Sequence, residues 1–289
     1  MWAFFALGAA FLTSFNPILY KRMLKNANAT VVVWGVTLLS LPLLGLLTLA
    51  LTRTPPDVDT LFALGVLGSA VLNVVAHLAS TQSLKLADAS LVIPLLTFSP
   101  VFTLMISALF LGEIPSPRGL LGVGLVLAGA YWLNHEPGRG WLAPWKAPAL
   151  KPGVALVLLA GLLWAITPLF EKTAIQHTRP QSPQFAAFIA TALLVLLLTP
   201  FVIGRNGAGL SQLSAYRREW LLAGLIAGTA PILGYMAFSQ GLVGYVTTLF
   251  RLSAAMTVLW GALILKEPGL RQRLPSSLMM VIGAILIAT

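Results

Sequence analysis

Residues 245–267 read YVTTLFRLSAAMTVLWGALILKE. Nearly every side chain in this stretch is apolar, and its length of about twenty residues is what a helix needs to cross the hydrocarbon core of a bilayer. Arg251 lies about 9 Å from the start of this predicted helix, at the rise of 1.5 Å per residue. A charge at that depth is costly, so its side chain faces a polar cavity or a partner, or extends to the membrane interface. We expect Arg251 to face a ligand, with structural pairing to a carboxylate as the alternative.

The composition extends this interpretation to the whole chain. Of its 289 residues, 58% are hydrophobic and 9% are charged, and the mean hydropathy is +0.90. A soluble domain carries about 25% charged residues. The composition therefore predicts a polytopic membrane protein, and we expect it to lie in the inner (plasma) membrane of the cell.

The net charge of +10 does not indicate a nucleic-acid partner. The 18 Lys and Arg lie mostly in short loops between apolar segments, as the positive-inside rule requires. The chain has no cysteine, which excludes disulfides, thiolate metal sites and thiol catalysis. We expect neither a metal nor a cofactor. The first nineteen residues lack the basic region of a signal peptide, so we keep them as part of the folded protein.

Ten apolar segments are long enough to be helices that span the membrane, where each helix satisfies its own backbone hydrogen bonds. They are residues 2–19, 30–51, 61–82, 89–111, 119–133, 153–170, 185–203, 220–240, 245–267 and 274–288. The predicted fold class is thus all-α, with ten transmembrane helices.

The two halves of the chain repeat each other. A shift of 151 residues places AFLTSFNPILYK (10–21) on GLLWAITPLFEK (161–172), and a shift of 154 places residues 83–113 on 237–267 without a gap. Prolines, serines and glutamates match, which means more than matched leucines. We predict a first five-helix repeat at 1–133, a linker at 134–151 and a second repeat at 152–289. Since five is odd, the second repeat enters the membrane in the opposite sense, which is an inverted repeat typical of transporters.

The loop charges address the orientation of the chain. The odd-numbered loops hold thirteen Lys and Arg, and the even-numbered loops hold four. By the positive-inside rule, the odd loops are cytoplasmic and both termini lie outside.

Two motifs resemble the EamA branch of the drug/metabolite transporter superfamily, the YddG-like ten-helix exporters. They are LFLGEIPSPRGLLGVGLVLAGAYWL at 109–133, and LILKEPGL (263–270) with LMMVIGAILI (278–287) at the end of the second half. The resemblance covers nearly the whole chain. It implies export or exchange of small metabolites by alternating access, with a central cavity between the repeats. It also implies cytoplasmic termini, opposite to the charge count, and the side of the termini stays open.

The third segment carries a polar face. Ser69, Asn73, His77 and Ser80 recur at spacings of four, four and three residues and so share one side of a helix. Four polar side chains would be unsatisfied against lipid, so this face should point into the protein. It either lines a substrate cavity or joins helices, and His77 is a group that can titrate near neutral pH.

Repeat symmetry and the repeated prolines mark further positions, each of which has packing as its alternative role. The residues that we expect to bind substrate are Arg251, Asn73, His77, Ser80, Thr97, Ser99, Tyr235, Ser253, Trp164 and Asn16. We expect Glu113 and Glu267, which end their segments, to act in capping or ion pairs.

By these boundaries no Asp or Glu lies inside an apolar segment, because Glu113, Glu171 and Glu267 all stand at segment ends. Exporters of lipophilic cations in related small proteins use an intramembrane carboxylate, so that substrate class is disfavoured. A buried Arg favours a substrate with a carboxylate or a phosphate.

We therefore expect a secondary transporter of small metabolites, most of all amino acids, acting in the bilayer as a monomer or homodimer. The alternative is an exchanger of phosphate esters or nucleotide sugars. A passive channel and a membrane-embedded enzyme are the other classes. The enzyme is disfavoured because the sequence contains no HExxH, GxSxG or P-loop motif.

Overall fold

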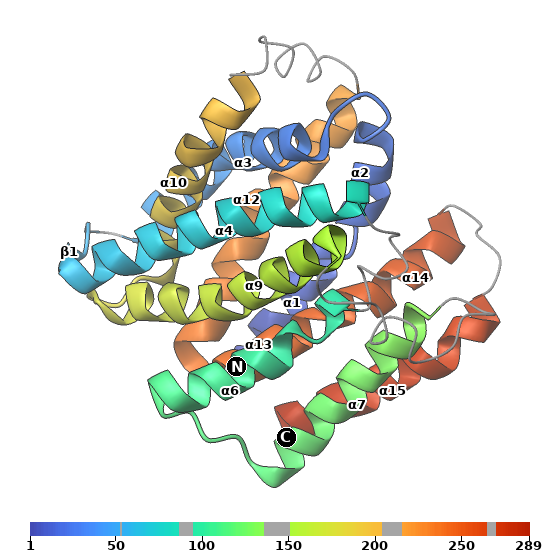
Figure 1. Cartoon of the computed structure of the whole chain (residues 1–289). Coiled ribbons are helices and arrows are strands. Elements are labelled where there is room, and N and C mark those ends of the chain that lie inside the picture. The colour runs from blue at the N-terminus through green and yellow to red at the C-terminus, as the bar shows by residue number, and fades with distance from the viewer. Residues whose placement is uncertain (53, 87–94, 136–150, 204–215, 265–269) are drawn as a thin grey trace. The chain divides into compact units, whose positions relative to one another are not determined.

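The computed structural model describes residues 1–52, 54–86, 95–135, 151–203, 216–264 and 270–289 (Figure 1). These residues form helices and one short pair of strands. In chain order the elements are α1 (Trp2–Thr13), α2 (Asn16–Met23), α3 (Ala29–Leu51), β1 (Asp57–Val58), α4 (Thr60–Leu86), α6 (Ser99–Leu111), α7 (Pro117–Leu133), α9 (Pro152–Gln176), β2 (Thr178–Arg179), α10 (Pro183–Ile203), α12 (Arg217–Gln240), α13 (Val243–Phe250), α14 (Leu252–Ile264) and α15 (Leu270–Ala288).

Within the described residues, seven helical stretches are long and apolar enough to cross a membrane, and three shorter apolar helices accompany them. Each predicted segment overlaps one of these ten stretches. Large apolar side chains cover the outside of the helices; Leu109 and Phe110 are 80% and 77% exposed. Such surfaces are stable against lipid and not against water. The prediction of an all-α polytopic membrane protein is thus confirmed at this level.

Two predicted helices are interrupted. The first segment breaks between α1 and α2, and the stretch at 245–267 breaks at Arg251, between α13 and α14. The Arg251 N–H donates to the carbonyl of Thr248, three residues back, and the Ala254 N–H donates to the carbonyl of Arg251. These i to i−3 bonds tighten the backbone into a turn at Arg251 and keep its polar groups satisfied inside the membrane.

The sixth predicted segment ends too early. Helix α9 continues to Gln176, six residues beyond the predicted end at Phe170. The added residues, EKTAIQ, contain neither Pro nor Gly and favour a helix. Glu171 therefore lies inside α9 rather than at its end, which corrects the expectation that no carboxylate lies within a membrane helix.

The chain packs as two compact units, and each draws on both halves of the sequence. Unit 1 contains Met1–Val74 and Leu169–Gln240, and unit 2 contains Val75–Pro168 and Gly241–Thr289. Helices α4 and α9 each begin in one unit and end in the other. Packing units are therefore distinct from sequence repeats.

Small residues bring the helices of unit 1 together. A Cβ on Gly224 of α12 would lie 2.9 Å from the Cβ of Leu39 on α3, and a Cβ on Gly45 of α3 would lie 3.3 Å from the ring of Phe188 on α10. The indole of Trp34 donates to the hydroxyl of Thr199, 3.0 Å away. Such close contacts and interhelical hydrogen bonds hold membrane helices together where hydrophobic burial does not.

In unit 2, helices α7 and α15 lie side by side (Figure 1). A Cβ on Gly122 would lie 2.6 Å from the carbonyl oxygen of Gly283, and one on Gly283 would lie 2.6 Å from that of Gly122. The two glycines thus allow backbone contact between the helices.

A buried carboxylate joins the end of α6 to the start of α13. Glu113 is 8% exposed, and its Oε2 accepts the N–H of Val243, the first residue of α13, at 2.7 Å. A negative charge is favoured at a helix N-terminus, where N–H groups lack partners in the helix. The capping role expected of Glu113 is what the structure shows. Glu267 lies outside the described residues.

We expect Glu113→Leu to lower the free energy of unfolding by about 1–3 kcal/mol, because it leaves the buried Val243 N–H without this acceptor. Glu113→Gln keeps an acceptor oxygen and should lose less. Unfolding of the purified protein in lipid–detergent bicelles measures both. Equal losses would contradict a hydrogen-bonding role.

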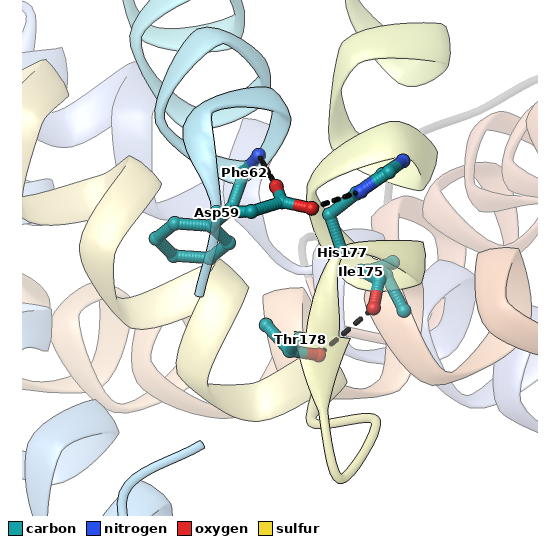
Figure 2. A network of polar contacts seen from close by, with 5 residues as sticks. All are labelled: Asp59, Phe62, Ile175, His177 and Thr178. Atoms are coloured by element: carbon teal, nitrogen blue, oxygen red, sulfur yellow. Dashed lines mark hydrogen bonds and ion pairs between the residues drawn. The ribbon is translucent and has the colours of Figure 1, made fainter. Parts of the chain in front are cut away.

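Strands β1 and β2 pair antiparallel, with Asp57 opposite Arg179, and bring the start of α4 to the end of α9 in unit 1. Figure 2 shows the polar contacts there. The Asp59 carboxylate accepts the N–H of Phe62 at 3.0 Å, which caps α4, and its other oxygen lies 2.7 Å from Nδ1 of His177. The hydrogen bond with His177, followed by that from Phe62, lowers the pKa of Asp59 below its ordinary value of 3.8.

A lowered pKa means that Asp59 stabilises the fold above pH 3.8 and loses this effect as the pH falls further, through its folded-state pKa. Asp59→Asn keeps the cap acceptor and removes the charge. We expect it to lower the Tm slightly at neutral pH, and the difference from wild type to shrink as the pH falls below 3.8 through the folded-state pKa of Asp59. A difference that stays constant with pH would contradict this account.

Candidate functional site

Arg251 is a partly buried cation at the break between α13 and α14 in unit 2. Its guanidinium donates a hydrogen bond through Nη2 to the hydroxyl of Ser99, which is 5% exposed and begins α6. Within the described part of the chain, no carboxylate pairs with Arg251. The alternative role for Arg251, structural pairing with a carboxylate, is therefore not seen among the described residues.

The surroundings of Arg251 favour negative charge. Helix α6 begins at Ser99 and α14 begins at Leu252, directly after Arg251. The N–H groups at these turns are already paired, since those of Val101 and Ala254 donate to the carbonyls of Phe98 and Arg251. Thr97 is buried two residues before Ser99, and Ser253 is partly buried two residues after Arg251. Together the side chains provide a cation and hydroxyl groups for an anionic group.

Unit 2 also brings His77 and Trp164 together. Their ring centroids lie 5.3 Å apart, edge to face, on α4 and α9. Ser80 follows three residues later on α4 and is partly buried. An aromatic pair of this kind can pack helices or can form an apolar wall beside a ligand. The sequence predicted both residues, and their contact was not foreseen.

The remaining predicted residues, Asn16, Asn73 and Tyr235, belong to unit 1. Asn16 lies at the start of α2, where α1 is interrupted, and its Oδ1 is the one buried side-chain polar atom without a hydrogen bond among the described residues. Asn73 is partly buried on α4, and Tyr235 is 7% exposed on α12. A buried amide oxygen without a donor is costly and is suited to a ligand that supplies one.

Sequence reasoning missed Glu171. Its Oε1 accepts a hydrogen bond from the hydroxyl of Ser69 at 3.2 Å, and the hydroxyl of Tyr235 lies close to the same carboxyl group. Ser69, Glu171 and Tyr235 thus form a polar cluster, which we call the Glu171 cluster, within unit 1. The run EKTAIQ without Pro or Gly was the signal that could have placed Glu171 within the helix.

The described residues contain no group of three or more His, Asp or Glu that could hold a metal ion.

The match to a protein family defines the class of this protein. The model of the EamA-like transporter family matches residues 1–135 and again 151–289. The chain therefore belongs to the EamA-like transporter family. It is a multi-pass membrane transporter of the drug/metabolite type, as the sequence motifs indicated.

Solved structures share this fold. One, described as "Crystal structure of protein", superimposes with a TM-score of 0.74 and 17% identity, covering 99% of this chain and 95% of that one. At this identity the likeness shows the fold alone. No curated protein matches the chain.

Proposed function

We propose that this protein is a secondary transporter that exports or exchanges small metabolites bearing an anionic group, most of all amino acids, across the inner (plasma) membrane. It works by alternating access between two five-helix repeats of opposite orientation, at residues 1–133 and 152–289. We do not propose that the protein converts its substrate chemically.

The observation that carries the proposal is Arg251. Its guanidinium lies at a helix break and donates to Ser99, and no carboxylate of the described residues neutralises it. An intramembrane cation with a neutral partner keeps donor capacity for a carboxylate, which it can bind through two parallel hydrogen bonds. Interrupted helices whose ends meet an anionic substrate are a common arrangement in secondary transporters.

Two observations support the inverted repeat. The family model matches each half once. The shift of 154 residues also aligns Phe98 with Leu252, and the chain turns at Phe98, just before α6, and at Arg251, one residue before Leu252. A repeated break is expected when each repeat supplies one interrupted helix to a shared substrate path.

Counterflow in proteoliposomes tests the function and the substrate class. Vesicles are preloaded with one unlabelled compound, and uptake of the labelled compound is followed. We expect saturable counterflow with amino acids. Counterflow with sugar phosphates instead would move the substrate class to phosphate esters. Uptake that does not saturate and shows no counterflow would contradict a transporter of this kind.

A further inference from the structure

The Glu171 cluster in unit 1 is a carboxylate beside two hydroxyl groups, and one of them, that of Ser69, donates a hydrogen bond to it. Ser69 is 1% exposed and Tyr235 is 7% exposed, so both partners are nearly cut off from solvent. Glu171 lies five residues before the end of α9, about 8 Å along the helix axis. Tyr235 likewise lies five residues before the end of α12. A carboxyl group at such a depth is expensive to keep charged, which marks it for a function.

Close packing of α4 against α9 fixes this geometry. A Cβ on Gly65 would lie 2.8 Å from the carbonyl oxygen of Phe170, and a Cβ on Gly68 would lie 2.4 Å from the ring of Phe170. These glycines let the two helices approach at the level of Ser69 and Glu171. The close approach of the two backbones therefore brings the hydroxyl of Ser69 within hydrogen-bonding reach of the carboxyl group.

The charged and titratable neighbours of Glu171 are few. Helix α4 presents the neutral hydroxyl of Ser69, and α12 presents the phenol of Tyr235. On α9 itself, Lys172 is next in the chain. Within the described residues, no cation forms an ion pair with Glu171. The carboxylate is thus not held permanently charged by a salt bridge there.

Hydroxyl groups are suitable partners for a carboxyl group that changes its protonation state. When Glu171 is ionised, it accepts a hydrogen bond from Ser69, and the nearby hydroxyl of Tyr235 can donate another. When it is protonated, its O–H can donate to either hydroxyl oxygen, because Ser and Tyr both donate and accept. The cluster satisfies both states without moving the backbone, whereas an Arg or Lys partner would satisfy the ionised state alone.

We propose that Glu171 is the proton-coupling site of this transporter, with Ser69 and Tyr235 as its positioning residues. One proton binds to the carboxylate of Glu171 from the water on one side of the membrane. The same proton leaves to the water on the other side later in the cycle, so one proton moves per turnover. This proposal rests on the proposed transport function, and it names the coupling ion of that function.

The experiment uses the full chain in proteoliposomes with an imposed gradient of one pH unit. One proton per cycle supports an accumulation of up to about tenfold per pH unit. We expect wild type to accumulate substrate, and Glu171→Gln, which mimics the protonated acid, to show none. Counterflow by Glu171→Gln should also lose the pH dependence of wild type. Asp57→Asn, the same chemical change on exposed strand β1, is the matched control and should behave as wild type.

A second measurement does not need a transported substrate. Infrared difference spectra between about pH 5 and pH 9 detect the carbonyl stretch of a protonated carboxylic acid. We expect such a band in wild type, its loss in Glu171→Gln and its retention in Glu171→Asp. Ser69→Ala and Tyr235→Phe should shift its titration midpoint, which a purely structural role would not do. A wild-type spectrum without this band overturns the proposal.

The outcomes separate the two proposals. Wild type that shows no counterflow with any compound contradicts the proposed function, while the infrared band still tests Glu171. Counterflow without pH-driven accumulation supports the function and overturns the coupling. If Glu171→Gln loses substrate binding at every pH and no infrared band appears, the carboxylate binds the substrate's amino group, and proton coupling is overturned.

Discussion

Replacing Arg251 by Leu should reduce counterflow by about 30-fold or more while the protein remains folded. Removing one partner of a buried, hydrogen-bonded charge pair costs about 2–5 kcal/mol, because the substrate's anionic group is left without its cation. Each 1.4 kcal/mol of binding free energy corresponds to a factor of ten in affinity. Counterflow at several substrate concentrations should show the loss as a higher apparent KM. Arg251→Lys keeps the charge but not the paired donors and should recover part of the affinity.

The matched control is Arg118→Leu, which removes an exposed Arg at the start of α7. It should leave counterflow near the wild-type rate. Ser99→Ala removes the neutral partner of Arg251 and should weaken transport less than Arg251→Leu does. If Arg251→Leu transports like wild type in a folded state, Arg251 is not part of the substrate path.

Replacing Gly122 by Ala, which adds one methyl group, should lower the free energy of unfolding by about 1–3 kcal/mol. A Cβ there would meet the carbonyl oxygen of Gly283 at 2.6 Å and the N–H nitrogen of Ile287 at 3.0 Å. Both are backbone atoms, so α7 and α15 must separate to admit it. Reversible unfolding in bicelles measures the change.

Gly124→Ala is the control for this substitution. Gly124 lies on the same helix, and a Cβ there would meet no atom within 4 Å. The alanine should leave stability unchanged or raise it slightly, because Ala favours a helix more than Gly does. A similar loss at Gly122 and Gly124 would show that helix propensity, not contact with Gly283, explains the result.

Much of the fold was predictable because apolar length alone defines a membrane helix. Residues 30–51 became α3 with a one-residue difference, and 185–203 became α10 with a difference of two. The break at Arg251 was not predictable, since it comes from local i to i−3 bonding within a continuous apolar run. Helix ends were also missed where no Pro or Gly marks them, and this error hid Glu171.

The sequence predicted which residues belong to the candidate site, but it did not predict which of them are in contact. Symmetry singled out Thr97, Ser99 and Ser253 near Arg251, but it aligned Ser99 with Ser253 and did not predict that Ser99 accepts from Arg251. That contact depends on how α6 packs against α13. Packing also mixes the two sequence halves in each unit, which a comparison of halves along the chain cannot reveal.

The central claim is that Arg251 binds the anionic group of the substrate. The most direct test compares two proteins, wild type and Arg251→Leu, each with two ligands. Competition of counterflow by an amino acid and by its carboxamide analogue is measured for wild type and Arg251→Leu. If Arg251 holds the substrate's anionic group, wild type prefers the carboxylate by about 30-fold or more, and Arg251→Leu loses that preference. An undiminished preference in Arg251→Leu would contradict the account.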